Sequence, residues 1–320
     1  QRQTGIRAAR VLEIMNNNTA VNRQKLHREM NSFARKVIDC DYSRDMIIGE
    51  IENRYGNISS DEREMLFYYV LEKSYRYVWS VEGKTAPSRL FRLMSGVVTG
   101  TDHVLDLNCV RSSAAMHIFT AVIDNIKKLP QSLDRGNCFS DAFYASCVRD
   151  LASCGALKSI EDADVLIIYL KQAAIILKNT PLFGVSNGIA RVNSDGISLE
   201  ELYLEVFSAF WNRVRWDEIF CSNPGASREL MKTKHILVDM MLNAPSGVTV
   251  DTIANDFFRD TGFGVEGDLY MISFLDFYFF AWMELFGIVR YARKRNHDAV
   301  SISITEHGRR FLQFLQKSFF

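Results

Sequence analysis

A dense group of basic side chains lies near the C-terminus, and such side chains can bind phosphate groups. Its members are Arg290, Arg293, Lys294, Arg295 and His297. On a loop, this group could follow a nucleic-acid backbone or lie in a minor groove, giving affinity without reading the base sequence. Three upstream residues would extend the surface if they face the same way: Arg228, Lys232 and Lys234. The alternative interpretation is a solvated loop tip that Asp298 partly neutralises.

A second pair of residues could perform acid–base chemistry. Arg111 and His117 lie in a segment expected to form one helix, 109–128. Their spacing resembles the Arg-x(4–6)-His motif of the HEPN ribonucleases. The resemblance implies that His117 acts as a general acid or base, and that Arg111 stabilises the charge that develops on the phosphorane. The alternative is a structural histidine beside a surface arginine.

Other residue types that support catalysis lack the spacing it requires. The six cysteines form no Cys-x-x-Cys pair and have no histidine at zinc-finger spacing. The carboxylate clusters at 61–64 and 200–205 have no histidine three or four residues away, and no glycine-rich phosphate loop is present. We therefore expect no cofactor and no metal, and we interpret the protein as non-enzymatic, with the ribonuclease as an alternative.

The composition limits the fold class. The chain has 320 residues, of which 48% are hydrophobic, with 38 basic and 38 acidic side chains. This balance excludes a disordered chain and a protein whose whole surface is basic. Five prolines and 18 glycines do not favour a β-rich fold. We predict a mainly α-helical protein of two domains, residues 1–222 and 223–320, with the boundary at the Ser-Asn-Pro-Gly sequence 222–225.

The first domain is expected to consist of consecutive helices. The helix after Asn22 is basic and the stretch from Asp39 to Glu52 is acidic, which indicates either neighbouring helices with complementary faces or a basic face for nucleic acid. Segments 140–154, 165–177 and 199–220 also have helical periodicity. Between the last two, Asn187 and Gly188 predict the turn of a short hairpin.

The second domain has the most informative order of elements. A helix at 228–243 precedes a shorter helix, 250–258, for which Thr249 is the expected N-cap. A third helix runs from 269 to 286 and ends at Gly287. Strands are expected at 288–291 and 299–304, on either side of the basic loop, and a final helix follows. We predict a winged-helix fold from this order.

Two sequence runs make this prediction more specific. The runs are Glu-Leu-Phe-Gly-Ile-Val at 284–289 and Ser-Ile-Thr-Glu-His-Gly-Arg-Arg-Phe-Leu at 303–312. Together they resemble winged-helix regulators of the multiple-antibiotic-resistance type, over about the last 95 residues. In that family the third helix commonly ends in Leu-x-x-x-Gly-Leu-Val and the wing leads into Leu-Thr-x-x-Gly-Arg. The resemblance implies a fold, and it gives only an expectation about function.

The chain departs from that family where DNA would be read. The third helix contains no lysine or arginine from 268 to 286, and its charged residues are all acidic. A helix that reads base edges needs polar or basic side chains, so phosphates would repel this one. We expect Phe277, Trp282 and Phe286 to be buried. Protein contact, or contact with the nucleic-acid backbone through the wing, is therefore preferred over sequence-specific reading.

A weaker copy of the same order is expected upstream. Helix 143–154, the glycine that follows it, and the apolar run 165–169 read as a strand would form a degenerate second winged helix near 140–178. The alternative is a plain helical bundle.

Partners and location follow from these expectations. We predict that the protein binds a nucleic-acid backbone or a partner protein, with an architectural helical scaffold as a further alternative. A homodimer could form through the final helix, whose apolar residues are Phe311, Phe314, Leu315, Phe319 and Phe320. Free cysteines and the lack of a signal peptide or membrane span predict an intracellular, reducing compartment such as the cytoplasm.

Overall fold

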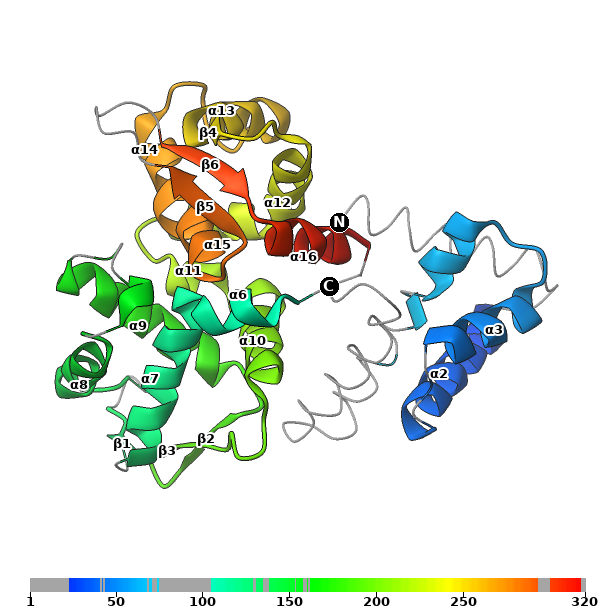
Figure 1. The fold of residues 1–320 in the computed structure, drawn as a ribbon, viewed down its shortest axis with the longest axis horizontal. Coiled ribbons are helices and arrows are strands. Elements are labelled where there is room, and N and C mark those ends of the chain that lie inside the picture. Colours follow the sequence, from blue (N-terminus) through cyan, green and yellow to red (C-terminus); the bar gives the residue numbers. More distant parts are fainter. Residues whose placement is uncertain are drawn as a thin grey trace. The chain divides into compact units, whose positions relative to one another are not determined.

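The structure is a computed structural model with two compact units: residues 1–104 with 313–320, and residues 105–312 (Figure 1). The residues it describes are 23–40, 42, 44–67, 69–70, 74, 105–128, 131–134, 138–152, 154–157, 160, 162–292 and 300–317. The chain is mainly helical, with small antiparallel sheets. Within the described ranges, no helix combines the length and apolarity needed to cross a membrane.

The first unit contains α2 (Arg23–Asp39), α3 (Arg44–Tyr55) and a further helical segment at 60–67. Glu50 on α3 pairs with Arg54 at 2.8 Å and approaches Lys36 on α2 to 3.8 Å. The Lys36 contact joins the basic and the acidic stretch, as expected for complementary helix faces. The Arg54 guanidinium also lies 4.7 Å from the centre of the buried Phe33 ring.

The second unit begins with α6 (Leu107–Ser112) and continues into a segment that we call the first repeat, residues 114–192. Its elements, in order, are α7 (Ala114–Lys128), β1 (Gln131–Ser132), α8 (Asp141–Leu151), the single 3₁₀ turn η2 (Gly155–Leu157), α9 (Ala163–Lys178), β2 (Phe183–Ser186) and β3 (Ile189–Val192). The three strands form an antiparallel sheet in the order β1-β3-β2.

A second segment, residues 224–304, has the same order and is called the second repeat. Its elements are α12 (Pro224–Asn243), β4 (Val248–Thr249), α13 (Val250–Thr261), a third helix, β5 (Val289–Ala292) and β6 (Ser301–Ile304). The third helix consists of α14 (Leu269–Phe274), the π-helical segment η4 (Leu275–Phe280) and α15 (Ala281–Leu285). The sheet order, β4-β6-β5, matches that of the first repeat (Figure 1).

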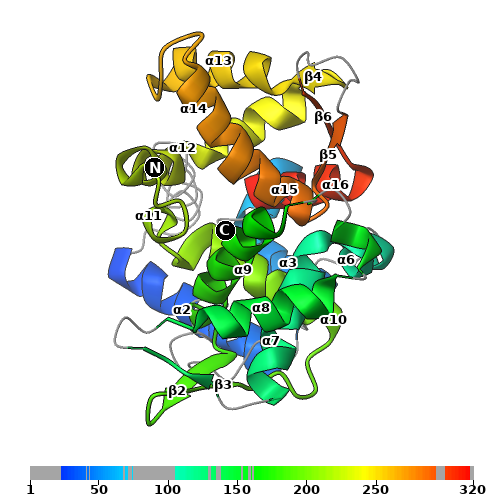
Figure 2. The same cartoon turned by 90° about the vertical axis from the view of Figure 1, so that its left-hand side faces the viewer.

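The two repeats are joined by α10 (Leu199–Ser208), the π-helical segment η3 (Ala209–Arg213) and α11 (Trp216–Ile219), and α16 (Glu306–Lys317) follows the second repeat. Figure 2 shows α14 and α15 running from the far end of the second repeat toward α9.

Several predicted local features are confirmed. Asn187 and Gly188 have φ angles of 53° and 73° and close a two-residue turn between β2 and β3. Positive φ at both positions matches the right-handed twist of the strands. Thr249 caps α13 by accepting the Thr252 N–H at 3.1 Å. Gly287, at a φ of 74°, ends the third helix.

Other predictions need correction. The expected helix 109–128 is broken at Ser113, whose extended backbone (ψ 135°) separates α6 from α7. The helix expected at 165–177 is confirmed as α9, so the alternative reading of the run 165–169 as a strand is wrong, because apolar residues continue at helical spacing to Leu177. The expected helix 199–220 is divided by η3 and by the extended residue Val214. The short strands β1 and β4 were not predicted.

The expected boundary at 222–223 lies inside the second unit, because side chains from both sides of it form one aromatic core. Trp282 lies 6.2 Å from Phe119, 6.0 Å from Tyr169 and 5.5 Å from Phe210, between ring centres. Trp282 and Phe286 are fully buried, which confirms the prediction for those two residues. Phe277 is the exception, since 37% of its surface is exposed.

A buried polar contact also joins the repeats. The Trp282 indole N–H donates to Gln172 Oε1 at 2.8 Å, and Gln172 Nε2 donates to the Ile219 carbonyl at 2.9 Å. Both side chains are buried. A buried donor without a partner costs about 1–3 kcal/mol, so this pair fixes how α15 can lie on α9.

A second buried network attaches α16. The Asp106 N–H donates to His307 Nδ1 at 3.2 Å, so the proton of the neutral ring lies on Nε2. Nε2 then donates to the Tyr203 hydroxyl at 3.1 Å, which donates to the Phe286 carbonyl at 2.8 Å. Burial lowers the pKa of His307 to about 4, because the charged imidazole would lose its hydration. A proton on Nδ1 would also leave the Asp106 N–H without its acceptor.

This shift makes stability depend on acidity. Between pH 6.5 and pH 4 the unfolded chain binds a proton at His307 that the folded chain does not, so the free energy of unfolding falls as the pH falls, by up to about 3 kcal/mol. The variant His307→Gln is less stable at pH 7 and lacks this dependence. Urea unfolding at pH 7, 6 and 5, followed by tryptophan fluorescence, will show that the difference in free energy of unfolding between the wild type and the variant becomes smaller as the pH falls. A constant gap would contradict the assignment.

The predicted Thr-x-x-Gly run has a packing role. The Thr305 hydroxyl donates to the Gly287 carbonyl at 2.7 Å and accepts the Gly308 N–H at 2.8 Å. Gly308 lies so close to the backbone just before β5 that a Cβ there would be 2.0 Å from the Ile288 carbonyl oxygen. Only glycine fits this position without displacing the backbone.

Replacement of this glycine is therefore expected to be costly. Gly308→Ala will lower the free energy of unfolding by at least about 2 kcal/mol, because the backbone contact cannot yield as a flexible side chain does. Gly225→Ala is the matched control, since a Cβ there makes only ordinary contact at 3.6 Å. Thermal unfolding will compare both variants with the wild type; equal melting temperatures for the two would refute the steric argument.

Candidate functional site

Exposed apolar side chains gather at the start of the third helix of the second repeat. Val265, Leu269 and Tyr270 expose 75%, 74% and 57% of their surface. Ser273 and Phe277 are exposed further along the same helix. We call these five residues the third-helix face. Exposed large apolar groups collected on one element mark contact surfaces more often than scattered single residues do.

The local sequence explains why this end is exposed. Asp268 caps α14 by accepting the N–H groups of Tyr270 and Met271 at 3.1 and 3.2 Å. The cap places Leu269 and Tyr270 in the first turn, before the buried residues Met271 and Ile272. The Gly267 N–H, in the preceding turn, donates to Asn255 on α13 at 2.9 Å, which ties this turn to the second repeat.

The other end of the third-helix face contacts the first repeat. The Phe277 ring stacks on Tyr169 of α9, with ring centres 6.2 Å apart and planes 21° apart. Next to it, the Tyr291 hydroxyl of β5 donates to Asp276 Oδ1 at 2.6 Å. Both Asp276 and Phe277 lie in η4, and π-helical segments inside α-helices are frequent at functional sites.

The corresponding helix of the first repeat differs. On α9, Ile168 is exposed but Tyr169, Leu170 and Gln172 are buried. Its two lysines contact rings of their own repeat: Lys171 Nζ lies 5.5 Å from the Tyr144 ring centre and Lys178 Nζ lies 5.2 Å from that of Phe139. Neither third helix therefore presents a row of basic side chains.

The predicted basic surface is only partly described. Arg293, Lys294, Arg295 and His297 lie outside the described residues. Arg290, on β5, is exposed and pairs with Ser303 in the sheet register. The strands on either side of the loop pair as predicted, with Val289 opposite Ile304.

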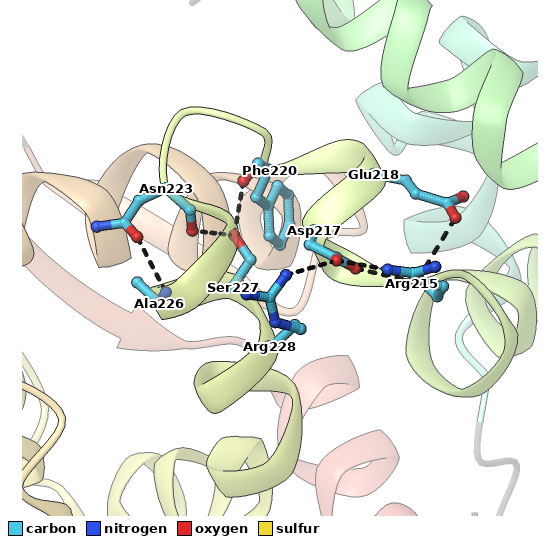
Figure 3. Close-up of polar contacts among 8 residues, drawn as sticks. All are labelled: Arg215, Asp217, Glu218, Phe220, Asn223, Ala226, Ser227 and Arg228. Atoms are coloured by element: carbon cyan, nitrogen blue, oxygen red, sulfur yellow. Dashed lines mark hydrogen bonds and ion pairs between the residues drawn. The ribbon is translucent and has the colours of Figure 1, made fainter.

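The two outer basic residues of α12, Arg228 and Lys232, have acidic partners, and Figure 3 shows that of Arg228. Arg228 Nη1 lies 3.0 Å from Asp217 Oδ2, and Arg215 forms two hydrogen bonds to the same carboxylate, at 2.7 and 3.2 Å. The hydrogen bond from Arg215, and then that from Arg228, hold the pKa of Asp217 below its usual value. Lys232 pairs with Glu229 at 3.0 Å. These partners reduce the charge that α12 offers to phosphate.

Lys234 does not extend the predicted surface. Its ammonium lies 4.4 Å from the Trp211 ring centre and 5.1 Å from that of Trp216, and it donates to the Trp211 carbonyl. Burial lowers the pKa of Lys234 to about 7. The side chain therefore serves the contact between α12 and the segment 211–216, which corrects its assignment to a phosphate-binding face.

The candidate ribonuclease pair lies on two helices. Arg111 is exposed near the end of α6, and His117 is partly buried in the first turn of α7. Because the chain is extended at Ser113, the pair does not share the single helix that the sequence predicted. The catalytic roles of Arg111 and His117 stay a prediction.

The final helix is used within the chain as far as it is described. Phe311 is buried, with its ring centre 4.6 Å from that of Phe207 and 5.9 Å from that of Tyr203. It cannot contribute to the predicted dimer surface, which corrects that assignment. The side chains of Phe314, Leu315, Phe319 and Phe320 lie outside the described part of the structure.

Comparison with known proteins found no match to the chain among family models, curated proteins or solved structures. The winged-helix resemblance of the C-terminal part rests on its own residues. Among the described residues, no three or more histidine, cysteine or carboxylate side chains are grouped in a way that could hold a metal ion.

Most of the third-helix face was not predicted from the sequence. The capping pattern at Asp268 could have placed Leu269 and Tyr270 in an exposed first turn, because the residues after an N-cap precede the packed part of a helix. Tyr169 and Tyr291 had no such local pattern, since they reach Phe277 and Asp276 only in the folded chain.

Proposed function

We propose that the two repeats are winged-helix modules in tandem, and that the protein is a non-enzymatic interaction protein that binds a protein partner. The order helix, strand, helix, helix, strand, strand, with the first strand against the last, supports this assignment for each repeat. In the second repeat, the helix that follows β6 and the basic sequence between β5 and β6 agree with the same fold.

The observation that carries the proposal is which part of the third helix in the second repeat is buried and which part is exposed. In winged-helix proteins that read DNA, this helix enters the major groove. Here its second half, including Trp282 and Phe286, is buried against the first repeat and α10. Its exposed first turn offers Leu269 and Tyr270, directly after the acidic residues Glu266 and Asp268. The apolar groups suit contact with a protein surface, and the acidic groups repel phosphate.

The partner surface expected from this composition is apolar with basic neighbours. Aromatic and large apolar side chains contribute most of the binding energy at protein interfaces, and charges at the rim favour the correct partner. Contact between the basic wing and a nucleic-acid backbone stays a prediction, and it would be independent of the third-helix face.

A photo-crosslinking experiment tests the proposal. The full chain carrying p-benzoylphenylalanine at Tyr270 is expected to form an adduct with a specific protein, which is then purified and titrated. Leu269→Glu will weaken that purified complex at least tenfold, because a charge would be buried against an apolar contact. Val185→Glu is the matched control, since Val185 is an exposed apolar residue on the hairpin of the first repeat.

Duplex DNA provides the opposite arm of the test. Fluorescence anisotropy at 50 and 200 mM salt will show that Leu269→Glu and the wild type bind random duplex equally weakly. Self-association that Leu269→Glu abolishes would identify the partner as a second copy. Tight duplex binding lost in Leu269→Glu, or a purified partner insensitive to that substitution, would overturn the proposal.

A further inference from the structure

A cavity of about 400 Å³ lies between α9 of the first repeat and the third helix and β5 of the second. Three aromatic and three acidic side chains contribute to its lining: Tyr169, Phe277, Tyr291, Asp162, Asp276 and Glu284. Its volume falls in the range typical of ligand sites. None of the described side chains that line it is basic.

The aromatic side chains form a fixed wall. Tyr169 is buried, and Phe277 stacks on it while remaining partly exposed. Tyr169 also meets Trp282 edge-on, with ring centres 6.0 Å apart, so the core of the unit holds its ring in place. The electron-rich faces of such rings attract organic cations, more strongly where water is partly excluded.

Tyr291 contacts two of the three carboxylates. The Tyr291 hydroxyl donates to Asp276 Oδ1 at 2.6 Å, and the Tyr291 backbone N–H donates to Glu284 Oε1 at 3.4 Å. Hydrogen bonds to a carboxylate stabilise its charged form. Burial, followed by the neighbouring Asp276, raises the pKa of Tyr291, so its hydroxyl stays a donor at physiological pH. The cavity therefore combines fixed negative charge with aromatic surface.

This combination selects the chemical class of ligand. A small metal ion would need several converging oxygen ligands, which the described carboxylates do not provide. An anion would meet three acidic side chains. A guanidinium or ammonium group on an aliphatic stem satisfies both features, because its charge can pair with Asp276 while its flat or apolar part covers Phe277 and Tyr169.

We propose that this cavity binds an arginine or lysine side chain of a protein partner that lies along the third-helix face. Phe277 belongs to both the face and the cavity, so a segment that covers Leu269 and Tyr270 can place a basic side chain here. The inference rests on the proposed function, because the cationic group is supplied by that protein partner.

Short peptides test the cavity without knowledge of the partner. The full chain is titrated by calorimetry or NMR with acetyl-Gly-Arg-Gly-amide and acetyl-Gly-Lys-Gly-amide. The uncharged analogues contain citrulline and norleucine. The basic peptides are expected to bind at least fivefold more tightly than their analogues. Equal binding of charged and uncharged peptides, or no binding of any peptide at 10 mM, would refute the inference.

Two substitutions locate the binding. Asp276→Asn keeps an oxygen that can accept a hydrogen bond from the Tyr291 hydroxyl but removes the charge. Phe277→Ala removes the exposed ring of the aromatic wall, which also meets Tyr278 edge-on, with ring centres 5.2 Å apart. Each substitution is expected to lower the affinity for the basic peptides at least fivefold. Asp260→Asn, an exposed acidic residue on α13, is the matched control and will leave binding unchanged. Circular dichroism and melting temperature verify that each variant is folded.

The two proposals fail separately. If Leu269→Glu disrupts the purified partner complex and Asp276→Asn affects neither the complex nor the peptides, the cavity inference is wrong and the protein-binding function stands. If the peptides depend on Asp276 and the purified partner is insensitive to Leu269→Glu, the cavity is a cation site and the docking surface is wrong.

Discussion

The hydrogen bond from Trp282 to Gln172 is the contact on which the arrangement of the two repeats depends. It joins the third helix of one repeat to the third helix of the other, in a region from which water is excluded. An indole N–H and an amide at such a place must find each other, because neither has solvent as a substitute. The pairing explains why α15 is unavailable to an outside partner, and why only the first turns of that helix remain exposed.

The second repeat could be predicted from its sequence because short-range chemistry determines its elements. Thr249 and Asp268 cap helices, Gly287 adopts a conformation that glycine favours, and the β-strands alternate in polarity. The first repeat was harder to predict, since the apolar run at 165–169 fits a buried strand as well as a buried helix. The π-helical segments have no sequence pattern that we recognised; they occur where aromatic residues of distant segments pack, as Trp211 and Phe279 do.

The site could be predicted less well than the fold, because charge in a sequence does not show where a side chain points. Lys234 is basic by type, yet its aliphatic stem and ammonium pack against Trp211 and Trp216. Arg228 pairs with Asp217, which lies on another helix and also binds Arg215. The cavity brings residues of α9 together with residues of η4 and β5 that lie more than a hundred positions further along the sequence, so no local spacing could have revealed it.

The two repeats share a topology, but their third helices have different surroundings. The first uses its third helix to support the second: α9 supplies Gln172 to the buried contact and Tyr169 to the cavity wall. The second repeat is left with one exposed face on the first part of its third helix, and the surface beside that face is acidic at Glu266, Asp268 and Asp276. These acidic groups flank the exposed part of the third helix and would repel phosphate. For the proposed interface, the aromatic contacts and the acidic side chains favour a basic protein segment over a nucleic acid.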